Sequence, residues 1–144
     1  MRKLYTIGYE GRNIEEFISE LIFHNITHLI DVRELPISRK KYFSKTPLKR
    51  RLNKENIEYI HIKPLGCPKE IRYKLKNDWD YDYFFDAYSD YLRENLEYVE
   101  EIMKYIAKGV VCLMCYERQP EKCHRIVIAR SIKEKNRELN IVHI

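Results

Sequence analysis

Short apolar runs alternate with longer amphipathic segments along this chain. Four runs are rich in β-branched, aromatic and other apolar residues and predict buried strands: "KLYTIGY" at 3–9, "THLIDVR" at 27–33, "EYIHIKPLG" at 58–66 and "VVCLMCY" at 110–116. The closing "IVHI" at 141–144 predicts a fifth, short strand. Gly8 and Gly11 end the first run, as expected of a buried strand.

Helical spacing marks the segments between these runs. Asn13 with Glu16 three residues later matches an Asn variant of the capping box and predicts a helix start. Its apolar stripe is Ile14, Phe17, Ile18, Leu21 and Ile22. Thr46 as N-cap, with Pro47 in the first turn, predicts a short helix over 47–56. Another helix is predicted over 123–136, just before the last strand.

The connection between the third and fourth runs is the longest. Residues 67–82 show no clean period, so we expect an irregular, partly helical excursion. The segment that follows keeps one apolar face and predicts a single long helix, ended by Gly109. The face consists of Phe84, Phe85, Tyr88, Tyr91, Leu92, Val99, Ile102, Met103 and Ile106.

Strands that alternate with helical crossovers pair in parallel. We therefore expect an α/β fold: a Rossmann-like three-layer sandwich with a mainly parallel sheet of about five strands, in the order 3-2-1-4-5. No repeat, low-complexity tract or linker divides the chain, which predicts a single domain over 1–144.

Three polar segments follow predicted strands directly. They are "GYEGR" after the first strand, "DVRELPISR" after the second and "CYERQPEKCHR" after the fourth. The carboxyl ends of parallel strands share one edge of the sheet, where such folds bind ligands. The sequence thus predicts that these segments meet in one crevice.

Composition narrows the class of partner. Lys and Arg outnumber Asp and Glu by 27 to 22, which gives a net charge of +5 among the 144 residues and favours an anionic small molecule or nucleic acid. No apolar stretch is long enough for a membrane span and no secretory signal is evident, so we expect a cytoplasmic protein with no membrane partner. The 34% of charged residues lean towards a thermophilic source, and the tyrosines of 81–105 suggest a homodimer.

The chain resembles the family catalogued as domain of unknown function 488. The matching pieces are "YTIGYEGR", "IDVRELPISR", "FSK", "YIHIKPLG" and above all "CYERQPEKCHR", in the family's order and over nearly the whole length. The resemblance supports the fold and the location of a site. It implies no activity, so the chemistry rests on the residues themselves.

Sulfur chemistry allows several alternatives. Cys112, Cys115, Cys123 and His124 are zinc-type ligands, but residues three apart in a strand point to opposite faces. We interpret Cys112 as a core residue and assign no metal site and no cofactor, leaving open whether Cys115, Cys123 and His124 bind a metal. Cys115 before a helix start also suggests a nucleophile, as in rhodanese-like sulfur transfer, or a redox pair with Cys123. The spacing of the loop differs from that of rhodaneses.

Charged residues in the three segments suggest an anion site and acid or base chemistry. Glu117 is our first choice for proton transfer, with Asp31 second and His124 suited by type. His61 is held in reserve. We assign substrate binding to Gly8, Tyr9, Glu10, Arg33, Arg39, Arg118, Cys123 and Arg125.

Two hypotheses of different class follow. The first is a small enzyme whose anionic substrate carries phosphate and is a nucleotide or a nucleic-acid component. In it, Arg33 and Arg125 position the anion, Glu117 moves a proton and Cys115 acts as nucleophile. The second is a non-catalytic nucleic-acid-binding module that uses the same basic crevice. An internal role, in which the arginines pair with Asp31 or Glu117, competes with both.

Overall fold

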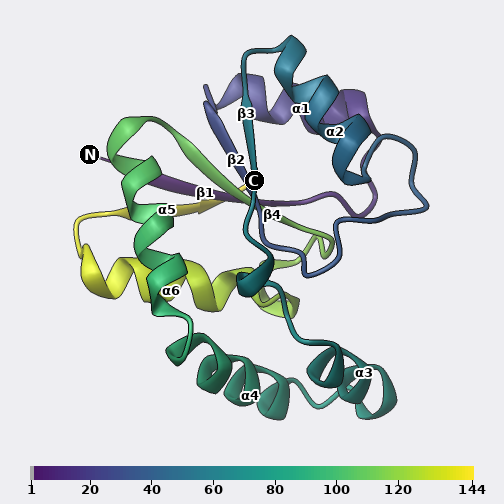
Figure 1. Cartoon of the computed structure of the whole chain (residues 1–144), viewed down its shortest axis with the longest axis vertical. Coiled ribbons are helices and arrows are strands. Elements are labelled where there is room, and N and C mark those ends of the chain that lie inside the picture. Colours follow the sequence, from purple (N-terminus) through teal and green to yellow (C-terminus); the bar gives the residue numbers. More distant parts are fainter. Residues whose placement is uncertain (1) are drawn as a thin grey trace.

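A single five-stranded parallel sheet forms the centre of the molecule. The computed structural model describes residues 2–144. The strands are β1 (Lys3–Gly8), β2 (His28–Asp31), β3 (Glu58–His61), β4 (Val111–Cys115) and β5 (Asn140–His143). All neighbouring strands pair in parallel, and helices cover both faces (Figure 1). The expected α/β three-layer, Rossmann-like sandwich is confirmed.

The order of the strands differs from the prediction. The sheet runs β3-β2-β4-β1-β5, so β4 lies between β2 and β1. The predicted order 3-2-1-4-5 instead placed the first strand between the second and the fourth. Both orders place β3 and β5 at the edges, where they are only partly covered, and β4 inside the sheet, where every residue is buried. Burial therefore does not distinguish the two orders; the difference lies in the pairing of β4 with both β2 and β1.

Helices α1 (Ile14–Phe23) and α2 (Lys45–Lys54) pack on one face of the sheet. The capping box at the start of α1 is confirmed: Glu16 N–H donates to the Asn13 side chain, and Asn13 N–H donates to the Glu16 carboxylate. The predicted N-cap of α2 is wrong by two residues, because the helix begins at Lys45 after Ser44. Pro47 still lies in its first turn.

The other face is covered by α4 (Tyr81–Arg93), α5 (Leu96–Lys108) and α6 (Arg125–Lys135). The single long helix predicted over this region is in fact α4 and α5. Helix α4 ends at Arg93, and α5 begins at Leu96 with Asn95 as its N-cap. The side-chain amide of Asn95 donates to the Tyr91 carbonyl in the last turn of α4. The apolar stripe continues across the break because both helices bury it in the same core.

Residues 67–82 contain more helix than predicted. Helix α3 (Lys69–Asp78) has no buried residue and reaches the core only through partly covered side chains, which is why its sequence shows no clean period. Short 3₁₀ turns at Lys63–Leu65 and Pro120–Lys122 complete the connections. In Figure 1, α3 and α4 lie below the sheet, at the opposite end of the view from α1 and α2.

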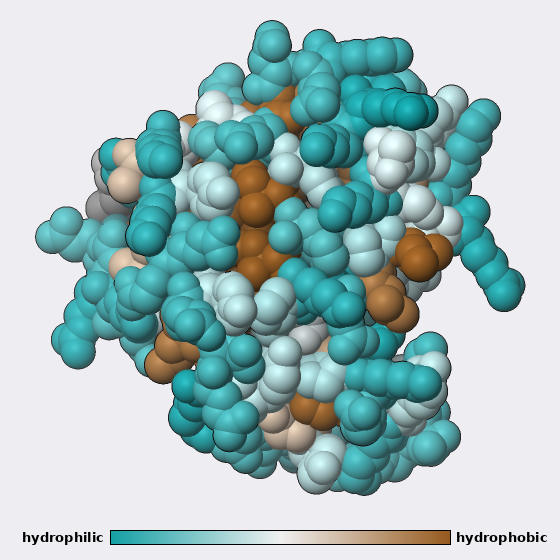
Figure 2. All heavy atoms as spheres, viewed as in Figure 1, coloured by the Kyte–Doolittle hydropathy of each residue, from teal (hydrophilic) through white to brown (hydrophobic). Residues whose placement is uncertain are grey.

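Adjacent strands β1 and β4 send their chains to opposite faces. The segment after β1 leads to α1 on one face, and the segment after β4 leads to α6 on the other. Such a divergence opens a crevice at the carboxyl ends of the two strands. The surface seen in Figure 2 is mostly hydrophilic, with apolar atoms in a narrow central band and a few smaller groups. None of the helices within 2–144 combines the length and apolarity that crossing a membrane requires.

Candidate functional site

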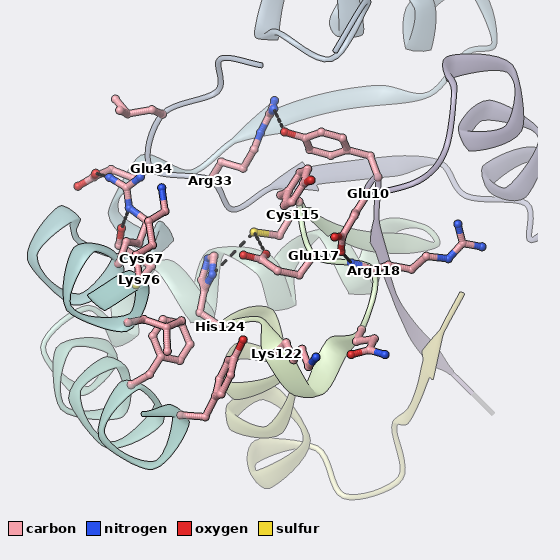
Figure 3. Close-up of a pocket in the computed structure, with 18 of the residues that line it drawn as sticks. Glu10, Arg33, Glu34, Cys67, Lys76, Cys115, Glu117, Arg118, Lys122 and His124 are labelled. Carbon is pink, nitrogen blue, oxygen red and sulfur yellow. Dashed lines mark hydrogen bonds and ion pairs between the residues drawn. The ribbon is translucent and has the colours of Figure 1, made fainter. Parts of the chain in front are cut away.

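A pocket of about 1010 Å³ lies at the carboxyl ends of the strands (Figure 3). The three polar segments singled out in the sequence meet there, as predicted. Tyr9 and Glu10 come from the first, Arg33 from the second, and Cys115, Glu117, Arg118 and His124 from the third. Side chains of α3 and the start of α4 close the remaining side, and their role was not foreseen.

Two backbone hydrogen bonds extend the β1–β4 pairing into the site. Tyr9 N–H donates to the Cys115 carbonyl at 3.2 Å and Glu10 N–H to the Tyr116 carbonyl at 2.8 Å. The chain after β4 then crosses directly over Gly8, where a Cβ would lie 1.8 Å from the Glu117 carbonyl oxygen. Gly8 therefore admits the Glu117 backbone, instead of the bound group that we assigned to it.

Four reactive side chains gather at the floor of the pocket and directly behind it. The sulfur of Cys115 lies 3.6 Å from Oε2 of Glu117 and 3.8 Å from Nδ1 of His124, and the sulfur of Cys123 lies 3.8 Å from the same nitrogen. Both cysteines and the histidine are buried, at 5% exposed or less. Figure 3 shows Cys115, Glu117 and His124 pointing toward one another from the end of β4 and the start of α6.

The orientation of His124 is fixed by the second strand. Its Nε2 lies 2.7 Å from the Val32 carbonyl oxygen, which only accepts, so Nε2 carries the hydrogen. In the neutral ring, Nδ1 then presents its lone pair to the two sulfurs. The Tyr88 ring contacts the imidazole edge at 5.0 Å between ring centroids and holds it from the side of α4.

Burial and mutual contact shift the pKa values of this cluster. Burial raises the pKa of Glu117 to about 7. The hydrogen bond to Cys123 and burial raise the pKa of Cys115, while burial alone would raise that of Cys123 but is outweighed by its contacts with Cys115 and His124. The pKa of His124 is raised by the Cys123 thiolate despite burial.

The remaining cysteines lie apart from this cluster. Cys112 is fully buried in the core between the sheet and α1, on the face opposite Cys115, as the strand geometry predicts. Cys67 lines the pocket near α3, and burial raises its pKa to about 12.

The atoms of Cys115, Cys123 and His124 that can bind a metal all lie within 4.8 Å of one another.

Asp31 and Arg33 form a buried pair. Arg33 donates through Nε to Oδ1 at 2.9 Å and through Nη2 to Oδ2 at 2.7 Å, and the Tyr59 hydroxyl donates to Oδ2 at 2.5 Å. Arg33 also donates to the Phe43 carbonyl. Arg33 reaches the pocket wall, whereas Asp31 does not line it. This favours the competing internal role for both residues.

Arg125 is also used internally. Its side chain is fully buried, donating to the Thr6 hydroxyl and to the carbonyls of Glu117 and Arg118. The Arg125 guanidinium thus holds the loop after β4 through the backbone carbonyls of that loop. The expected ion pair between Arg125 and a carboxylate is absent among the described residues. Neither Arg125 nor Cys123 lines the pocket, and the exposed Arg39 lies outside it as well. His61 Nε2–H donates to the Arg33 carbonyl at 2.7 Å, and His61 also lies outside the pocket.

Cations without an ionic partner surround the pocket. Lys76, Arg118 and Lys122 line it, and within 2–144 none of the three forms an ion pair. Arg72 is paired with Glu34 at 2.6 Å. Glu10 accepts a hydrogen bond from the Arg118 backbone N–H, which ties the first and third segments together.

The residues that sequence reasoning missed come mainly from the fourth wall. Apart from Arg72 and Lys76, α3 and α4 contribute Leu75, Trp79, Tyr81 and Phe84. Trp79 is the chain's only tryptophan, is 61% exposed and adopts a left-handed conformation with φ 53°. A bulky residue in that conformation is unusual and marks a position worth a functional hypothesis. The presence of a single tryptophan in the sequence was the one feature that could have drawn attention to this wall of the pocket.

Comparison with known proteins identifies one family. Residues 13–132 match the model of the family described as Domain of unknown function DUF488. The match contains the second and third polar segments and all four residues of the floor cluster. No curated protein and no solved structure matches the chain.

Proposed function

Because this chain belongs to the DUF488 family, whose description states no activity, we propose a function from the site: an enzyme that binds a phosphate-bearing substrate with an aromatic ring, such as a nucleotide, at the carboxyl ends of the strands. The observation that carries the proposal is the combination of a buried reactive cluster at the pocket floor with unpaired cations and an exposed tryptophan around it.

Phosphate binding rests on the three unpaired cations. Arg118 and Lys122 come from the loop after β4, and Lys76 comes from α3. In Figure 3 the Arg118 side chain extends outward from the floor cluster, so its guanidinium serves at the rim of the pocket in this proposal. The guanidinium of Arg118 offers the planar donor geometry that phosphate prefers. These residues replace Arg33 and Arg125 as the anion ligands, since both of those are satisfied internally.

Ring binding rests on the aromatic side chains of the pocket. Trp79 and Tyr116 line it and remain 61% and 46% exposed, although large aromatic rings are usually more covered. They come from opposite parts of the chain, the end of α3 and the end of β4. Exposed aromatic rings beside cations provide a stacking surface for a nucleobase with a nearby place for its phosphate.

Catalysis rests on the floor cluster. Of the three carboxylates that line the pocket, Glu10 is bonded to a backbone amide and Glu34 to Arg72, whereas Glu117 forms no ion pair with any described residue. Glu117 is half-buried, and a carboxyl withdrawn from water without a cation is costly and is not needed for packing. We assign proton transfer to Glu117, and Cys115 is the cluster sulfur that faces the substrate.

Trp79 fluorescence tests substrate binding directly, because no other tryptophan contributes. We expect saturable quenching by AMP, weaker binding of adenosine and weak binding of inorganic phosphate. Arg118→Gln should weaken AMP about tenfold, as loss of one charged hydrogen bond of ~1.5 kcal/mol would. Trp79→Phe gives the signal baseline. Equal affinity for AMP and adenosine would refute the anion site, and absence of binding by every nucleotide tried would refute the substrate class.

Turnover separates the enzyme from the binding module. The protein is incubated with nucleotides that quench Trp79, and products are sought by mass spectrometry. Glu117→Gln should keep binding and lose product formation. Binding without any product would instead support the nucleic-acid-binding module, and a persulfide on Cys115 of the isolated protein would support sulfur transfer.

A further inference from the structure

Cys115, Cys123 and His124 present their donor atoms as one compact set. The two sulfurs each lie 3.8 Å from Nδ1 of His124, and all three atoms lie within 4.8 Å of one another. A tetrahedral Zn²⁺ with bonds of about 2.3 Å to sulfur and about 2.0 Å to nitrogen separates these donors by roughly 3.6 Å. The side chains therefore already stand near the spacing of a metal site.

The histidine is oriented as a ligand is. Its Nε2–H donates to the Val32 carbonyl at 2.7 Å, which fixes the tautomer and leaves Nδ1 free to bind. Metal-binding histidines almost always donate their other ring N–H in this way. The carbonyl belongs to the segment just after β2, so three separate parts of the fold build the arrangement.

The fourth position lies on the pocket side. Cys115 and His124 line the pocket, while Cys123 lies behind them. Oε2 of Glu117 is 3.6 Å from the Cys115 sulfur, which is again about the separation of two ligands on one tetrahedral ion. Three protein ligands and a position open to substrate is the pattern of catalytic zinc sites.

We propose that Cys115, Cys123 and His124 bind one divalent transition-metal ion of the Zn²⁺ class, with its fourth position facing Glu117 and the pocket. Cys112, which lies on the opposite face of β4 from Cys115, is not a ligand in this set. The argument that both cysteines of the strand cannot bind one metal therefore does not apply. On binding, both cysteines coordinate as thiolates, and the thiol protons leave to solvent. The Cys115 sulfur is then a ligand and no longer a nucleophile.

The inference does not rest on the proposed function, because metal content is measured without a substrate. Protein isolated under reducing conditions should contain about one Zn²⁺ per chain by elemental analysis. The reduced apoprotein should take up about one Co²⁺ with the visible bands of tetrahedral cobalt and thiolate charge-transfer bands. Zn²⁺ should then displace the cobalt.

Matched cysteine variants locate the site. Cys123→Ser should weaken Co²⁺ binding by more than the roughly 10–100-fold that loss of a second-shell partner costs, and should reduce the charge-transfer bands. Cys112→Ser and Cys67→Ser, which replace buried cysteines outside the set, should bind as the parent chain does. Circular dichroism checks that each variant folds. If Cys123→Ser does not fold, the thiolate charge-transfer bands of the cobalt-loaded parent protein still report whether cysteines bind the metal.

Three outcomes would overturn the proposal. One is a folded, fully reduced chain that binds neither Zn²⁺ nor Co²⁺. Another is cobalt bound without thiolate bands, or equally well after Cys123→Ser in a folded variant. The third is a Cys115–Cys123 disulfide in protein isolated without oxidant, with no metal uptake after reduction, which would show a redox pair.

Discussion

Arg125 shows how far residue type can mislead about role. An arginine beside a helix start predicts an anion ligand, yet this guanidinium is fully buried and satisfied by a hydroxyl and two carbonyls. Its partners Glu117 and Arg118 belong to a loop whose path over Gly8 no local pattern reveals. The sequence identified the residue as important but not the backbone atoms that it binds.

Arg125→Lys should lower the free energy of unfolding by about 1.5–3 kcal/mol, because an ammonium group cannot reach all three acceptors and leaves a buried carbonyl unbonded. Urea unfolding measures the change. Arg130→Lys, on the exposed side of the same helix, should stay within about 0.5 kcal/mol of the parent. Unchanged stability of Arg125→Lys together with weaker AMP binding would restore Arg125 as an anion ligand.

Cys67 should be nearly inert to alkylation in the native protein. Burial raises its pKa to about 12, against about 8.5 for a free cysteine, so little thiolate exists near neutral pH. Because the thiolate is the reactive form, the rate of labelling by iodoacetamide should rise about tenfold for each pH unit as the pH approaches 12. Peptide mass spectrometry follows the site, with protein unfolded in guanidinium as the reference. Native labelling as fast as that reference near pH 8 would contradict the assignment.

Periodicity predicted the individual elements better than it predicted their limits and order. The apolar stripe of 84–106 is real, but it continues through the break at Asn95 because α4 and α5 face the same core. Helix α3 was predicted only as part of an irregular, partly helical segment, because none of its residues is fully buried. The central place of β4 depends on long-range pairing with β1 and β2, which its apolar sequence allows without specifying the neighbours.

The contact between β1 and the loop after β4 can be tested at Gly8. Gly8→Ala would place a Cβ 1.8 Å from the Glu117 carbonyl oxygen, so the loop must move. We expect a loss of about 1–3 kcal/mol or more in unfolding free energy, as overpacking causes. Gly11→Ala is the comparison: its Cβ meets only an Arg118 side-chain atom at 3.4 Å, and its φ of +74° costs roughly 1–2 kcal/mol. A Gly8→Ala protein as stable as the parent would show that the loop does not lie against β1.

At the scale of the whole molecule, the convergence of three distant segments followed from parallel pairing alone. This prediction holds even though the predicted strand order was wrong, because the carboxyl ends of all parallel strands lie at the same edge of the sheet. It does not predict the fourth wall, since α3 and α4 reach the pocket through a long connection that no strand end constrains. A homodimer stays a prediction, which analytical ultracentrifugation would check.

The positive charge of the molecule distinguishes a defined anion pocket from a diffuse nucleic-acid surface. The double variant Arg118→Gln/Lys122→Gln removes two pocket cations, and Lys104→Gln/Lys108→Gln removes two exposed cations from α5, outside the pocket. Net charge falls equally in both. If the pocket binds the phosphate, the first variant should weaken AMP by about tenfold or more, as loss of a charged hydrogen bond predicts, and the second should leave Trp79 quenching unchanged. Equal, strongly salt-dependent losses in both variants, seen with a fluorescent single-stranded oligonucleotide, would instead assign the charge to general nucleic-acid binding, because counterion release depends on the number of phosphates neutralised and not on where one pocket lies.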